Sequence, residues 1–229
     1  MSINHELLDI YNQKWNDLYH SLKDLDSKLY ANPFLIAFNE REYEQADLKV
    51  MIFGQETKGW LSKEGLLESP ELITSRYYNF FCLKKFYKGY GRSSFWRAFR
   101  FFQKELKTAY PNKNIYFSWN NINKIGKRKG TGFSLETEKI EREYLPVIVA
   151  EVELFKPDIV IFLTGPNRDS RISHHFHDAE FLSVDEFTPL RALAKVKSTL
   201  LPEKTIRIYH PSYYSGYNKV RSLAASLLI

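Results

Sequence analysis

The pattern of apolar and polar positions predicts four buried strands. Apolar segments, each followed at once by small or polar residues, run over residues 47–53 (DLKVMIF), 114–119 (NIYFSW), 158–163 (DIVIFL) and 204–208 (KTIRI), and in the last of them Ile206 and Ile208 alternate with polar residues. A near-continuous run such as 50–53 is typical of a strand that is buried on both faces of a parallel sheet. Connections that return such strands in parallel bring their carboxyl ends to one edge, where α/β proteins bind ligands.

Apolar residues recur with helical spacing in the segments that flank these strands. The pattern predicts one or two helices over residues 4–29, and single helices over 95–109, 135–155, 188–200 and 218–229. Ser93-Ser94 provides an N-cap for the helix over 95–109. We interpret residues 1–45 as a helical cover without chemistry of its own and residues 166–178 as a polar loop. With no linker or repeat in view, we expect a single domain over residues 1–229.

Composition agrees with one α/β domain that has an ample core. The 229 residues are 44% hydrophobic and 16% aromatic, and 33 Lys and Arg against 27 Asp and Glu give a net charge of +6. That basic bias is compatible with a polyanionic partner, but it is also common in proteins that bind none. The N-terminus has no basic region followed by an apolar one, and no apolar run reaches membrane-spanning length. We therefore expect a soluble, cytoplasmic monomer that does not contact a membrane.

The sequence does not indicate a metal or another cofactor. Cys82 is the single cysteine, which excludes an intrachain disulfide and any four-cysteine zinc or iron–sulfur site. His174, His175 and His177 lie close together in sequence, but they lack the spacing of a metal-ligand motif. A polar loop is the better interpretation of this segment.

Polar residues with catalytic potential directly follow the predicted strands. Gln55 and Glu56 follow the first strand, Asn120 and Asn121 the second, and the sequence His210-Pro211-Ser212 follows the fourth. A histidine just beyond a strand end is well placed for chemistry. Taken alone, His210 is better explained as a residue that closes the strand before Pro211 stops it.

Two segments combine features of nucleic-acid binding with an ordinary structural alternative. The long connection over residues 57–92 interleaves basic and aromatic residues, as a groove that follows phosphates and stacks bases would require. An aromatic mini-core with lysines on its solvent side explains the same pattern. The loop over 123–132 (NKIGKRKGTG) is the strongest basic run, with three glycines and four cations, and it suits either phosphate contacts or a solvated surface. Its cations are Lys124, Lys127, Arg128 and Lys129.

The strand-end motifs resemble those of the uracil-DNA glycosylase superfamily. Gly54-Gln55-Glu56-Thr57 resembles the family's GQDPY-type or GEAPG-type loop, Asn120 its strand-ending asparagine, and His210-Pro211-Ser212 its HPS-type loop. The resemblance covers roughly residues 47–229 by the order of the elements. It implies a three-layer α/β/α fold with a central four-stranded parallel sheet. It also implies hydrolysis of the N-glycosidic bond of uracil or another damaged base, flipped out of single- or double-stranded DNA.

The resemblance implies a role for each matching residue. Glu56 would polarise the attacking water, and His210 would stabilise negative charge on the departing base. Gln55 would contact the carbonyl of the base, and Asn120 would read its Watson–Crick edge, with Asn121 competing for that role. The stacking aromatic would be Phe80, Phe81 or Tyr78, and Tyr213 or Tyr214 would enter the groove in place of the family's leucine. The residues expected to contact DNA are Lys58, Lys127, Arg128, Lys129, Ser212, Tyr214, Lys219 and Arg221.

The sequence also departs from the family pattern, and it leaves two other functions open. Glu56 replaces an aspartate, and Thr57-Lys58 replaces the Pro-Tyr pair whose tyrosine excludes thymine in the family. A nucleic-acid-binding protein that keeps the pocket without hydrolysis would accommodate these substitutions. A hydrolase acting on a nucleoside or another small molecule would use the same pocket without needing the basic loop.

Overall fold

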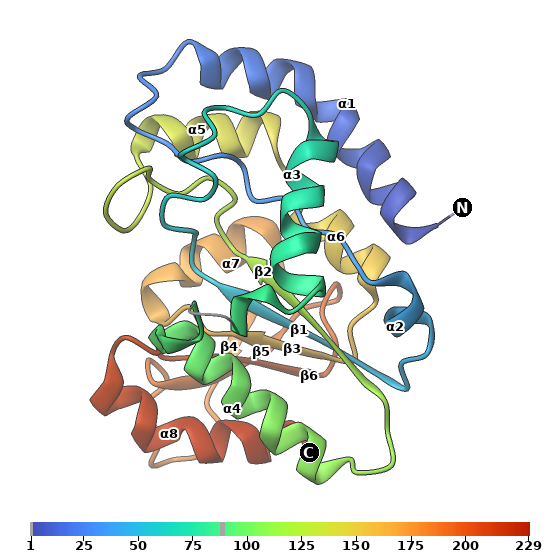
Figure 1. Cartoon of the computed structure of the whole chain (residues 1–229). Coiled ribbons are helices and arrows are strands. Elements are labelled where there is room, and N and C mark those ends of the chain that lie inside the picture. The colour runs from blue at the N-terminus through green and yellow to red at the C-terminus, as the bar shows by residue number, and fades with distance from the viewer. Residues whose placement is uncertain (1, 88–89) are drawn as a thin grey trace. The chain divides into compact units, whose positions relative to one another are not determined.

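The computed structural model describes residues 2–87 and 90–229 (Figure 1). The chain divides into two compact units, and it passes repeatedly from one to the other. Unit 1 comprises Met1–Glu40, Gln55–Lys85 and Asn121–Leu154, and unit 2 comprises Arg41–Gly54, Phe86–Asn120 and Phe155–Ile229. The two units differ in architecture, because unit 1 consists of helices and long connections whereas unit 2 is built around a sheet.

Within the described residues, the sheet of unit 2 has six strands in the order β2-β1-β3-β6-β5-β4. They are β1 Leu48–Gly54, β2 Ile115–Asn121, β3 Ile159–Phe162, β4 Glu180–Leu182, β5 Leu193–Lys197 and β6 Lys204–Ile208. Strand β3 pairs in parallel with β1 and with β6, whereas β5 runs antiparallel to both β6 and β4. The α/β class is confirmed, and the sheet is larger and more mixed than the predicted four-stranded parallel sheet.

The central strands form because their apolar residues are buried on both faces. Ile161 of β3 lies opposite Ile52 of β1 and Ile206 of β6, and all three side chains are buried. Helices α4 (Ser94–Ala109) and α8 (Tyr214–Ser226) cover one face of the sheet, and α7 (Asp169–His175) lies over the other (Figure 1). As predicted, the Ser93 hydroxyl caps α4 by accepting a hydrogen bond from the Trp96 amide, 3.3 Å away.

The predicted helix over 188–200 is wrong, because this segment contains β5. Its Leu193, Ala194 and Val196 are buried while Lys195 and Lys197 are exposed. Lysines at alternate positions suit a strand that has one face exposed to solvent, but by composition they also favour a helix. Pairing with β6 decides between the two structures, and the local sequence does not.

Other predicted helix boundaries also need correction. The helix over 135–155 is two helices, α5 (Leu135–Tyr144) and α6 (Ile148–Phe155), because Pro146 lacks the amide that a continuous helix requires. The polar loop over 166–178 contains α7, preceded by a 3-10 turn η4 (Pro166–Arg168). Helix α8 begins at Tyr214 rather than at residue 218, and the first helix, α1, spans Ile3–Lys23.

Unit 1 packs its helices around an extended segment that has no regular structure. Helix α1 contacts α5 and α3 (Pro70–Tyr77), and a π-helical turn η1 (Tyr78–Cys82) follows α3. Residues 30–38 are all buried, although they form neither helix nor strand. Side chains replace the missing ladder, since Asn4 exchanges two hydrogen bonds of 2.8 Å with the Phe38 backbone and the Tyr11 hydroxyl accepts from the Ile36 amide.

The remaining short elements lie in the connections. They are α2 (Glu40–Glu44) and the 3-10 turns η2 (Lys85–Tyr87) and η3 (Tyr90–Arg92). No helix in the described ranges is both long and apolar enough to cross a membrane.

Candidate functional site

The predicted site residues are divided between the two units, so each group is described within its own unit. Asn120, His210, Ser212, Tyr214, Lys219 and Arg221 belong to unit 2. Gln55, Glu56, Lys58, Phe80, Phe81, Asn121, Lys127, Arg128 and Lys129 belong to unit 1.

In unit 2, the turns after β3 and β6 pack tightly against each other. The Gly165 amide donates to the Ile208 carbonyl at 2.9 Å. Gly165 has a φ of +69°, and a Cβ on it would lie 3.0 Å from the His210 amide nitrogen. Only glycine tolerates both conditions without strain. The carboxyl ends of these parallel strands therefore hold the backbone of His210 in place.

The His210 ring is oriented by Ser212. Its Nδ1 lies 2.6 Å from the Ser212 hydroxyl, and it accepts a hydrogen bond of 3.2 Å from the Ser212 amide. A backbone amide can only donate, so Nδ1 acts as an acceptor and the neutral ring carries its proton on Nε2. The two contacts with Ser212 thus fix the orientation of the imidazole just beyond the end of β6.

The turn after His210 distinguishes the two tyrosines that were candidates for entering a groove. The Tyr213 amide donates to the His210 carbonyl, and the Tyr213 ring packs against Tyr209 with 4.9 Å between ring centroids. A Cβ on Gly216 would come within 2.2 Å of the Tyr213 ring, so glycine allows the ring to lie in this position. Tyr213 is 55% exposed and Tyr214 66%, but it is Tyr214 that lines the neighbouring pocket. Tyr214 is therefore the better placed of the two to reach a ligand.

A pocket of about 130 Å³ lies where the first turns of α4 and α8 meet. It is lined by Ser94, Arg97, Ala98, Pro211, Tyr214, Tyr217, Asn218 and Arg221. The sequence predicted Tyr214 and Arg221 as ligand contacts, but it did not point to Arg97 or Tyr217. Helices α4 and α8 lie far apart in the sequence, so no local pattern could have brought these residues together. Lys219, the other cation predicted on α8, is exposed and does not line the pocket.

Asn120 and Asn121 are the last residues of β2, rather than residues that follow it. Both are buried, and the Asn120 amide nitrogen lies 3.7 Å from the Met51 sulfur in the neighbouring strand. The strand therefore extends two residues further than predicted. The Asn120 side chain is accordingly part of the packed interior of unit 2.

In unit 1, the segment after β1 is hydrogen-bonded to the basic loop over residues 123–132. The Asn123 amide donates to the Gln55 carbonyl and the Gly59 amide to the Lys127 carbonyl, both at 2.9 Å. The Glu56 carboxylate accepts from the Gly132 amide at 2.9 Å. Gly126 lies so close to the Thr57 carbonyl that a Cβ would be 1.9 Å from its oxygen. Glu56 therefore helps to hold the basic loop closed.

The basic loop packs against the rest of unit 1, and one of its cations lies in the core of that unit. Lys124 is fully buried and pairs with the buried Glu151 at 2.6 Å, so the interpretation of Lys124 as a phosphate contact is wrong. Its side chain extends inward because an oppositely charged partner is available there. Arg128 donates to the Ser27 carbonyl at 3.3 Å and is half-buried, whereas Lys129 and Lys58 are exposed.

The aromatic residues of the long connection form a small core in unit 1. Trp60 contacts Phe34 and Phe80 edge to face, and Phe81 is buried against Tyr77 with ring centroids 5.5 Å apart. This arrangement favours the mini-core interpretation for Phe81, while Phe80 is half-exposed. Residues 88–89 of the connection lie outside the described residues.

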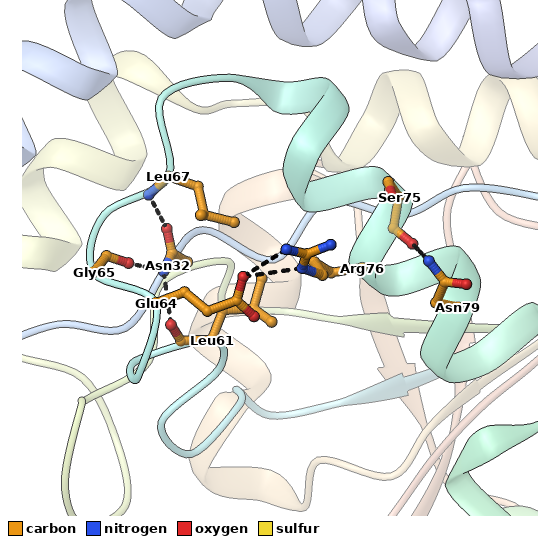
Figure 2. A network of polar contacts seen from close by, with 8 residues as sticks. All are labelled: Asn32, Leu61, Glu64, Gly65, Leu67, Ser75, Arg76 and Asn79. Carbon is orange, nitrogen blue, oxygen red and sulfur yellow. Dashed lines mark hydrogen bonds and ion pairs between the residues drawn. The ribbon is translucent and has the colours of Figure 1, made fainter.

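Polar contacts fold the rest of this connection (Figure 2). The Asn32 side chain donates to the Gly65 carbonyl at 2.6 Å and accepts from the Leu67 amide at 2.8 Å. An ion pair of 2.9 Å joins Glu64 to Arg76 of α3. The buried Asn32 thereby determines the path of the loop that passes over it.

A scan against protein-family models finds no match for this sequence, and a search of curated proteins finds none either. Within residues 2–87 and 90–229, no group of three or more His, Cys, Asp or Glu side chains could hold a metal ion.

Proposed function

We propose that this protein is a DNA glycosylase, which hydrolyses the N-glycosidic bond of uracil or another damaged base in DNA. The observation that carries the proposal is the position of His210. It follows β6 at the carboxyl ends of the parallel strands, and its Nδ1 accepts a hydrogen bond from the Ser212 amide, which orients the ring. An oriented imidazole in this position suits a reaction that leaves negative charge on a departing base.

The reaction needs two complementary groups. The bond between C1′ of the sugar and the base nitrogen breaks, with its electron pair remaining on the base, and the water oxygen bonds to C1′. The sugar passes through an oxocarbenium-like state that a carboxylate stabilises. The attacking water gives a proton to that carboxylate, and the departed base anion takes up a proton from solvent. We assign the carboxylate role to Glu56 from the resemblance of its motif, and the stabilisation of the base anion to His210.

Exposed groups in both units suit a polyanionic substrate. Tyr214 and Arg221 line the pocket of unit 2, and Lys58 and Lys129 extend into solvent from unit 1. Cations of this kind replace counterions along a phosphate backbone, and an exposed ring can stack on a base.

A second function, nucleic-acid binding without hydrolysis, is favoured by one contact. The Glu56 carboxylate accepts a hydrogen bond from the Gly132 amide. A carboxylate that serves to close a loop has less freedom to orient a water molecule. In that case Glu56 would be structural, and binding would survive without any release of base.

The experiment that separates the two functions measures release of free base from end-labelled oligonucleotides that carry uracil, hypoxanthine, xanthine or a thymine mismatch. We expect release from one of these lesions, and a reduction of about 100-fold or more in His210→Ala and in Glu56→Gln, the usual range for loss of a general acid or base. His177→Ala, which removes an exposed histidine of unit 2, serves as the matched control and should retain full release. No release from any lesion, with salt-dependent binding intact, would refute hydrolysis in favour of the binding protein.

A further inference from the structure

The pocket in unit 2 lies at the amino ends of two helices. Ser94 and Arg97 belong to the first turns of α4, and Tyr214 and Tyr217 to the first turns of α8, which lies beside α4 (Figure 1). The first amides of a helix have no partner within it, and the helix dipole adds partial positive charge there. No side chain caps the amino end of α8, whereas the Ser93 hydroxyl caps α4. Helix starts that border one cavity add partial positive charge near it, which favours an anion.

The charged side chains that line the pocket have the same preference. Arg97 and Arg221 contribute two guanidinium groups, and among the described residues none of those that line the pocket is acidic. The Arg221 guanidinium lies 5.0 Å from the centre of the Phe101 ring, which limits the positions it can adopt. A planar guanidinium is suited to paired hydrogen bonds with phosphate oxygens.

Two polar atoms of the pocket residues lack a partner, which points independently to a ligand. Tyr217 is only 4% exposed, and its hydroxyl has no hydrogen-bond partner within the described part of the chain. The side-chain oxygen of the neighbouring Asn218 is also buried without one. Buried polar groups are nearly always paired in native proteins. Burial raises the pKa of the Tyr217 hydroxyl, which therefore stays protonated and able to donate at neutral pH.

We propose that this pocket binds a phosphate group of a nucleic acid, held by Arg97, Arg221 and the Tyr217 hydroxyl. The proposal rests on the proposed function in taking a nucleic acid as the source of the phosphate. A volume of about 130 Å³ is several times that needed for one water molecule, so the cavity can admit such a group. The source is either a phosphodiester of the backbone or a terminal phosphate of a strand, and both present the same oxygens.

The test is equilibrium binding of two single-stranded oligonucleotides of the same undamaged sequence, one of them 5′-phosphorylated. Binding is followed by fluorescence anisotropy over a range of salt concentrations. We expect Arg97→Gln and Arg221→Gln each to weaken binding about tenfold, as loss of a charged hydrogen bond does. Each should also reduce the slope of log K against log salt by about 0.7. Lys104→Gln is the matched control, because it removes an exposed charge of α4 outside the pocket, and it should change affinity by less than about twofold.

The two probes identify the source of the phosphate. Preference for the 5′-phosphorylated strand, abolished in both arginine variants, assigns the pocket to a terminal phosphate. Equal binding of the two strands, weakened alike in both variants, assigns it to the backbone. Variants that bind either strand as well as Lys104→Gln does would overturn the proposal, as would a wild-type protein that binds neither strand.

Tyr217→Phe tests the pocket without changing its charge. We expect weaker oligonucleotide binding together with a melting temperature that is unchanged or higher, because an unpaired buried hydroxyl has been removed. A lower melting temperature with unaltered binding would instead show a purely structural tyrosine and overturn its role here.

The outcome for this pocket is distinguishable from the outcome for hydrolysis. Base release that persists at the wild-type rate in both arginine variants, with wild-type binding, refutes the pocket alone. Arginine-dependent binding by a protein that releases no base from any lesion supports the pocket and refutes only hydrolysis.

Discussion

The two units of this protein differ in how they accommodate buried charge. In unit 2 the centre of the sheet is apolar, with Val50, Ile52, Val160 and Ile161 all completely buried, and the buried Arg207 pairs at 2.8 Å with the partly exposed Asp169. In unit 1 the interior contains ionisable side chains, among them the fully buried pair Lys124 and Glu151. The comparison shows that the two units are stabilised differently. Apolar cores tolerate changes that conserve volume, whereas a buried ion pair depends on each partner being present.

The polar interior of unit 1 is a connected network. The Glu151 carboxylate accepts from the Tyr11 hydroxyl at 2.6 Å as well as from the Lys124 ammonium. The nearby Glu141, also buried, accepts from the Ile125 amide at 2.9 Å. Burial lowers the pKa of the Lys124 ammonium, and the Glu151 carboxylate acts in the opposite sense. These bonds join α1, α5, α6 and the basic loop, so the network determines how unit 1 is assembled.

The largest effect should come from breaking this network. Lys124→Met leaves the Glu151 carboxylate buried without its cation, and we expect it to lower the free energy of unfolding by about 3–5 kcal/mol, measured by urea denaturation. The double variant Lys124→Met/Glu151→Gln removes both charges and keeps an acceptor for Tyr11, so most of the loss should be recovered. A double variant as unstable as the single one would show that packing, rather than the charge pair, is responsible.

A smaller effect should follow from disturbing the contact between the segment after β1 and the basic loop in unit 1. Gly126→Ala introduces a Cβ at 1.9 Å from the Thr57 oxygen, and overpacking of this kind costs about 1–3 kcal/mol. Gly130→Ala, in the same loop, is the control, because it has a φ of +86° but meets no atom within 4 Å. The two variants compared by thermal unfolding separate steric clash from backbone strain. If Gly130→Ala proves the more damaging, close packing against Thr57 is not what holds the loop.

A conservative change in unit 2 should cost less still. Ile161→Val removes one methylene from the centre of the sheet, and we expect a loss of about 0.5–1.5 kcal/mol. Since no charge is involved, urea denaturation should give the same difference at low and at high salt. A loss that varied with salt would contradict the apolar description of this core.

The smallest effect concerns the exposed carboxylate of Asp178 in unit 2. Hydrogen bonds from the Ser198 hydroxyl and from the Thr199 amide and hydroxyl lower the pKa of Asp178 to about 2. Because the folded-state pKa lies below the unfolded one, this carboxylate stabilises the protein fully above about pH 4 and loses that contribution as the pH falls through about 2. The difference in melting temperature between wild type and Asp178→Asn should therefore shrink between pH 5 and pH 2. A difference that stays constant over this range would refute the shift.

The local pattern of apolar residues correctly located the strands that are buried on both faces and the helix whose apolar residues recur at regular spacing. Strands β1, β3 and β6 and helix α4 lie close to where their apolar residues predicted them. It failed at β5, where exposed lysines alternate with buried aliphatic residues and only pairing with β6 selects a strand. It also failed at Lys124, because nothing near this residue in the sequence identifies Glu151 as its partner.

The sequence by itself determined the α/β class, the strands at the centre of the sheet, and the presence of His210, with Ser212 two residues later, just beyond a strand. These features depend on the composition of a few consecutive residues, which is enough to decide whether a segment is buried. Only the tertiary structure decided the division into two units, the inward direction of Lys124, and the pocket that joins Arg97 to Tyr217. Each of these depends on contacts between residues far apart in the chain. A charged side chain is buried only where such a contact supplies an oppositely charged or hydrogen-bonding partner.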